Sequence, residues 1–116
     1  MNLRLDEHSV RLRLSAADAS CLLAEGAIKQ VWSVAGADLE LQVLLCNEVQ
    51  AVEVSFDLPL CVVRVKQSAF EHALQLVPAR DAGVYARSAE GHEFALEIDS
   101  FSAKGKRAES LTKGKL

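Results

Sequence analysis

Apolar and polar residues alternate with a period of two along most of the chain. Leu3 and Leu5 flank Arg4, and the same alternation runs through residues 9–14 and 92–99. Because successive side chains of a strand point to opposite faces, this period is typical of strands with one buried face. The alternation and the turn signals between its segments predict eight strands, near residues 2–6, 9–14, 28–35, 39–46, 49–57, 60–66, 83–88 and 92–99.

Two segments leave this period and are predicted to be short helices, at residues 16–25 and 69–77. Each follows a serine and has an acidic residue three positions after that serine: Ser15 with Asp18, and Ser68 with Glu71. A serine oxygen accepts from the free N–H groups of a first helical turn, and a carboxylate suits its positive end. We expect Gly26 to end the first helix and Pro78 to end the second.

The predicted elements repeat: strand, strand, helix, strand, strand occurs twice. Sliding the first half by 53 positions superposes similar residues, among them Val10 on Val63, Arg11 on Arg64, Ser15 on Ser68, Leu41 on Phe94 and Val43 on Leu96. Any two strand-rich segments match in part when slid, since their period is two, but the phase of both serines and the last hairpin favours duplication. We therefore predict pseudo-repeats at residues 1–47 and 54–100 that fold together about a pseudo-twofold axis.

The 116 residues suffice for one domain, and half of them are hydrophobic. The predicted fold is α+β, with about eight mainly antiparallel strands in a bent sheet or small barrel and two short helices packed against it. Residues 1–100 form the single domain, and residues 101–116 form a basic tail that we expect to be disordered.

Charge is unevenly distributed between the body and this tail. The last 13 residues hold five basic residues and one acidic residue, a balance of +4 in a chain of net charge −3, which leaves −7 for residues 1–103. A basic tail suggests weak nucleic-acid contact, because phosphates attract Lys and Arg. The acidic body and the lack of stacking aromatics beside the basic residues argue against it, so nucleic acid is an unfavoured partner.

The cysteines and histidines offer little chemistry. Cys21, Cys46 and Cys61 are odd in number and widely spaced, so we predict reduced, inert thiols and no metal site. Together with the absence of an export signal or an apolar run long enough to span a membrane, this favours the cytoplasm. His8 and His92 fall in predicted turns and should be solvated. A small enzyme that uses one of these cysteines with His72 or His92 stays an alternative, because such pairs meet in space. No cofactor is predicted.

The outward positions of the predicted strands carry arginines, namely Arg4, Arg11, Arg13 and Arg64, with Arg87 as a further candidate. If these line one outer sheet face, their guanidinium groups are suited to holding an anion or an acidic peptide. The competing interpretation is that they pair with outward acids of adjacent strands, such as Glu53 and Glu97, and thereby support the sheet.

Residues 9–15, with the sequence SVRLRLS, and the Ala/Leu-rich helix that ends at Gly26 resemble a small bacterial family of about 120 residues, a domain of unknown function. The resemblance implies no activity and no site residues. Relatives end in an acidic segment, whereas this chain ends in basic residues, so no role of the tail carries over. We expect a non-catalytic binding or interaction protein that self-associates or docks a partner through a sheet edge or the arginine face.

Overall fold

The structure, a computed structural model, describes residues 1–77, 79 and 81–99. Within them the chain forms β1 (Asn2–Leu5), β2 (Ser9–Leu14), α1 (Ala16–Glu25), β3 (Ala27–Val34), β4 (Ala37–Cys46), β5 (Val52–Asp57), β6 (Leu60–Lys66), α2 (Gln67–Leu76), β7 (Gly83–Arg87) and β8 (Glu93–Ile98). The prediction of eight strands and two helices is confirmed. The predicted tail, residues 101–116, lies outside the described residues.

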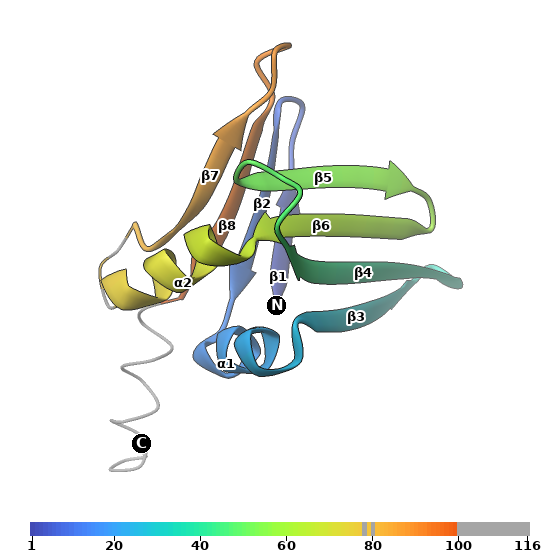
Figure 1. Cartoon of the computed structure of the whole chain (residues 1–116). Coiled ribbons are helices and arrows are strands. Elements are labelled where there is room, and N and C mark those ends of the chain that lie inside the picture. Colours follow the sequence, from blue (N-terminus) through green and yellow to red (C-terminus); the bar gives the residue numbers. More distant parts are fainter. Residues whose placement is uncertain (78, 80, 100–116) are drawn as a thin grey trace.

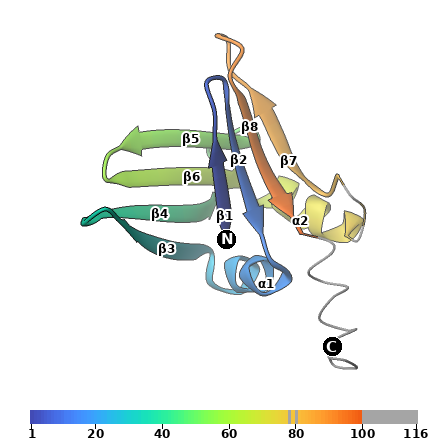
Figure 2. The ribbon, with the colours of Figure 1, turned by 180° about the vertical axis from the view of Figure 1, so that it is seen from behind.

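The strands form two mixed four-stranded sheets. Sheet A has the order β1-β2-β8-β7 and sheet B the order β3-β4-β6-β5. Hairpin neighbours are antiparallel, but the central pairs, β2 with β8 and β4 with β6, are parallel. The strands of one sheet cross those of the other steeply, and both helices lie at one end of the molecule (Figures 1 and 2).

The α+β prediction is therefore correct, whereas the mainly antiparallel bent sheet or small barrel is wrong. Each sheet takes one hairpin from each half of the chain, and the two hairpins join through a parallel central pair. In the part of the chain that the structure describes, the two sheets stay separate and do not close into a barrel. A period of two reveals which face of a strand is buried, but it does not reveal which strand lies beside it.

The core lies between the inner faces of the sheets and the helices. In β2, Leu12 and Leu14 are buried, while Arg11 and Arg13 between them point outward to solvent. Further fully buried side chains come from both sheets and both helices: Leu22, Leu41, Val43, Val63, Val65, Phe70 and Leu96. Removal of this apolar surface from water is the main driving force for the fold.

The first helix has the predicted caps. The Ser15 hydroxyl accepts from the Asp18 N–H at 3.1 Å, and the Asp18 carboxylate accepts from the Ser15 N–H at 3.4 Å, which together form a capping box. Gly26, with φ +80°, ends the helix in the left-handed region that favours glycine.

The predicted cap of the second helix is wrong. The N-cap residue of α2 is Lys66, which makes no side-chain cap bond, and Ser68 lies inside the helix. Lys66 is also the last residue of β6, and its N–H donates to the Ala51 carbonyl at 2.7 Å. The helix starts where this strand ends, because the β6 pairing fixes the chain up to Lys66. The Glu71 carboxylate accepts from the Gln67 side chain instead, at 3.2 Å.

The two halves follow the same strand order when sheet B is written β5-β6-β4-β3 beside β1-β2-β8-β7. Leu3 pairs with Leu12 and Val54 with Val63, so the first hairpins correspond with an offset of 51 positions. The central pairs then match Val43 to Leu96, an offset of 53. The ungapped offset of 53 is thus right for β4 and β8 and two residues too large for β2 and α1, which explains the misplaced cap at Ser68.

Candidate functional site

The outer face of sheet A gathers most of the predicted site residues. Arg4 of β1 lies opposite Arg11 of β2, Arg11 opposite Ala95 of β8, and Ala95 opposite Tyr85 of β7. Since opposite residues share a face of the sheet, these positions form one surface. We define the outer face of sheet A by its outward residues, which are Asn2, Arg4, Ser9, Arg11, Arg13, Gly83, Tyr85, Arg87, Glu93, Ala95 and Glu97.

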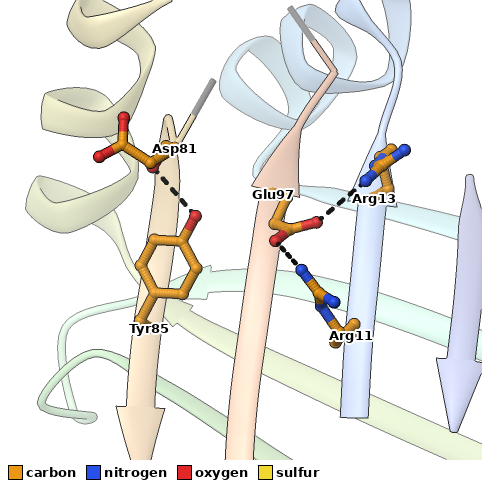
Figure 3. A network of polar contacts seen from close by, with 5 residues as sticks. All are labelled: Arg11, Arg13, Asp81, Tyr85 and Glu97. Carbon is orange, nitrogen blue, oxygen red and sulfur yellow. Dashed lines mark hydrogen bonds and ion pairs between the residues drawn. The ribbon is translucent and has the colours of Figure 1, made fainter. Parts of the chain in front are cut away.

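Glu97 holds two of the arginines. The Arg11 Nη2 donates to Oε2 of Glu97 at 2.7 Å, and the Arg13 Nη2 donates to Oε1 at 3.5 Å (Figure 3). The Glu97 side chain is only 15 % exposed, whereas both arginine side chains are about half exposed. The hydrogen bond to Glu97 and its negative charge raise the pKa of Arg11. Glu97 therefore fixes two guanidinium groups at the surface.

Tyr85 stands on the far side of Glu97 from these arginines (Figure 3). Its hydroxyl donates to the Asp81 carbonyl at 3.0 Å. Burial raises the pKa of Tyr85, and the charges of Glu97 and Asp81 raise it further. Gly83 is needed here, because a Cβ at this position would lie 2.6 Å from the Leu96 carbonyl oxygen and 3.0 Å from the Tyr85 hydroxyl.

Two further arginines complete the face, and they differ in their partners. Arg87 forms an ion pair with Glu93 across the β7–β8 hairpin. Arg4 makes no hydrogen bond or ion pair with any residue that the structure describes. Arg4 is therefore a cation on this face whose donors are all available.

A shallow, open hollow of about 710 Å³ covers this surface. Its lining combines cations, acids and an aromatic ring, among them Arg4, Asp6, Arg11, Tyr85, Arg87 and Glu93. Arg4 and Arg11 are opposite each other on neighbouring strands, so two guanidinium groups reach the hollow from adjacent positions. Asp6, Tyr85 and Glu93 were not among the predicted site residues. The alternation in β7 and β8 placed Tyr85 and Glu93 outward, but no signal in the sequence placed these strands beside β2.

Arg64 is not part of this face. It lies on β6 in sheet B, where its Nη1 is 3.5 Å from the Ser55 hydroxyl and 3.8 Å from a Glu53 carboxylate oxygen. The prediction of a single face that includes Arg64 is wrong, because β2 and β6 are corresponding strands in opposite sheets. The competing prediction is confirmed for the pairs, since Glu97 and Glu53 hold Arg11 and Arg64.

The histidines and cysteines do not converge. The His8 and His92 rings stack with centroids 6.0 Å apart, because the turns that carry them meet at one end of sheet A. Cys61 is buried, which raises the pKa of its thiol, while Cys21 is exposed and Cys46 is half-buried. Among the described residues, no contact joins a cysteine to a histidine, and no three potential ligands gather for a metal ion.

Comparison with protein families places the chain. Residues 1–104 match a family of unknown function, DUF7009. The chain belongs to DUF7009. The predicted resemblance to a small family of unknown function is thereby confirmed, and DUF7009 brings no assigned activity to this face. A search of curated proteins finds no match. No helix in the described part of this DUF7009 chain has the length and apolar character needed to cross a membrane.

Proposed function

We propose that the chain is a non-catalytic binding protein and that the outer face of sheet A binds carboxylates of an acidic peptide. The observation that carries this proposal is the free guanidinium of Arg4 beside Arg11 in an open hollow. Guanidinium groups bind carboxylates through paired hydrogen bonds, and a free one does so without first breaking an internal ion pair.

The distribution of charge supports this choice. Of the 13 Lys and Arg residues, five lie in the last 13 positions, and four of the remaining eight stand on this face: Arg4, Arg11, Arg13 and Arg87. The rest of the body is acidic, so an acidic ligand is repelled elsewhere and attracted here. Glu97 keeps Arg11 and Arg13 ordered, which reduces the side-chain entropy that binding would otherwise cost.

Fluorescence anisotropy of a labelled Glu-rich peptide, with the matching Gln-rich peptide as reference, tests the proposal. We expect the Glu-rich peptide to bind more weakly as salt rises, and R4Q to raise its dissociation constant about tenfold. R64Q is the matched control, because Arg64 is also an outward strand arginine but lies in sheet B. Equal effects of R4Q and R64Q, or no preference for the Glu-rich peptide, would contradict the proposal.

The other two hypotheses from the sequence have less support. A Cys/His enzyme needs two groups in contact, and the described cysteines and histidines are not. Nucleic-acid binding rests on the basic tail, which lies outside the described residues.

We also infer that the halves arose from one duplicated ββαββ unit, an inference supported by their equal strand order. If the units are equivalent, the link between β4 and β5 occupies the place of the termini, which both reach the start of α1: Met1 through Asp18, and Asp99 through Leu14. A circular permutant opened at residues 47–51 and closed through residues 100–116 should then unfold in one cooperative transition. Loss of that transition would argue against equivalent units.

A further inference from the structure

Four strands lie at sheet edges, and β3 is the longest of them. It has 8 residues, compared with 4 in β1, 6 in β5 and 5 in β7. β3 forms the lower border of sheet B in both views, and α1 lies beside only its start (Figures 1 and 2). A long edge offers a row of free backbone groups for another strand.

The register shows which residues of β3 present those groups. Leu45 donates to the Gly26 carbonyl at 2.9 Å, and this pair continues the β3–β4 ladder. Because hydrogen-bonded pairs alternate in an antiparallel ladder, the even residues of β3 bond to β4. The odd residues therefore direct N–H and C=O outward, and all four are exposed: Ala27, Lys29, Val31 and Ser33.

This edge has little of the charge that protects the others. β1 carries Arg4, β5 carries Glu53 and Asp57, and β7 carries Arg87. Over twice the length of β1, β3 has only Lys29, while Val31 is 47 % and Val34 64 % exposed. Natural edges are usually kept short or charged to prevent pairing, so an open apolar edge points to a pairing surface.

We propose that two copies of the chain pair through antiparallel β3 edges, forming one continuous sheet from the two copies of sheet B. A twofold contact of identical edges requires antiparallel strands, and outward residues must pair with outward residues. Two registers then pair most of β3: one sets Lys29 opposite Val31 of the second copy, and the other sets it opposite Ser33.

Charge complementarity supports a second copy as the occupant. Val31 lies beside Glu40 of β4, and Ser33 lies beside Asp38. In either register Lys29 therefore faces a carboxylate of the second copy one strand further on, about 10 Å away between Cα atoms and within reach of the two side chains. Lys29 has no ion-pair partner among the described residues, and neither Asp38 nor Glu40 has a cationic one. This surface lies on sheet B and is independent of the arginine face.

Sedimentation velocity of the full chain over a range of concentrations tests the pairing. We expect a dimer, and we expect V31K to raise its dissociation constant at least about tenfold, because it adds a second cation to the shared edge. Y85K is the matched control: Tyr85 is an edge residue of β7 with outward backbone groups and is 49 % exposed. It should leave the dimer unchanged. A monomer at all concentrations, or equal effects of V31K and Y85K, would overturn the proposal.

A charge exchange provides a second test that does not depend on V31K folding. K29E alone and the double variant D38K/E40K alone should each be monomeric, because like charges then face each other. An equal mixture of the two should form heterodimers, since the carboxylate introduced by K29E in one copy would face the ammonium groups introduced by D38K/E40K in the other. Heterodimers in the mixture alone support the β3 contact, and unchanged dimers of either variant overturn it.

Discussion

The two ββαββ units reach the same topology with helices that are held in different ways. In the first unit, α1 has a capping box, a C-terminal glycine and an ion pair between the Met1 ammonium and Asp18 at 3.0 Å. In the second unit, α2 lacks a side-chain cap but contributes Phe70, the largest of the fully buried side chains. Local hydrogen bonds thus anchor one helix and core packing anchors the other, so neither device is required by the topology itself.

The largest expected effect tests the packing of α2. Phe70→Ala should lower the free energy of unfolding by about 3 to 5 kcal/mol, because it leaves a cavity where both sheets and the helix meet. Urea unfolding followed by circular dichroism measures this loss. Leu76→Ala on the same helix is the control, since Leu76 is 43 % exposed and should cost far less. Equal losses would show that Phe70 does not anchor α2.

A smaller effect separates the caps. Ser15→Ala should cost about 1 kcal/mol, because it leaves the Asp18 N–H without its acceptor. Ser68→Ala should change stability by less than about 0.5 kcal/mol, because Ser68 lies inside α2 and caps nothing. The same unfolding experiment compares the two serines directly. A loss at Ser68 as large as that at Ser15 would restore the cap that the sequence suggested for α2.

The smallest effect is a pH dependence confined to the first unit. Burial alone would raise the pKa of Asp18, but hydrogen bonds from the Met1 ammonium and Ser15 outweigh it and lower the pKa below the ordinary value of 3.8. The folded state thus favours the carboxylate, so its contribution is present above about pH 4 and is lost as pH falls further. Unfolding free energies between pH 2 and 6 should fall less steeply in Asp18→Asn than in the natural chain. Parallel pH profiles would contradict this role.

Much of the fold was predictable because its signals are local. The inward positions of β2, β4, β6 and β8 followed from their period of two, and α1 followed from Ser15, Asp18 and Gly26. The start of α2 was not predictable, because β6 holds the chain up to Lys66 and overrides the cap motif at Ser68.

The candidate site was predictable in composition but not in arrangement. The sequence identified the outward arginines and two of their acids, Glu53 and Glu97. It placed Arg64 on the wrong surface and omitted Tyr85, because both errors concern which strands are neighbours. Neighbours in this fold are far apart in sequence, as the pairing of Ser9 with Glu93 illustrates.

The central place of β8 in sheet A has a consequence for biosynthesis. This strand is the last to leave the ribosome, yet β2 and β7 both pair with it, so sheet A stays incomplete until residue 98 has emerged. The nascent chain therefore keeps the β1–β2 hairpin and its leucines unsatisfied for almost the whole of translation. Chaperone binding to the first hairpin during synthesis, with release only after termination, is the cellular behaviour that this strand order implies.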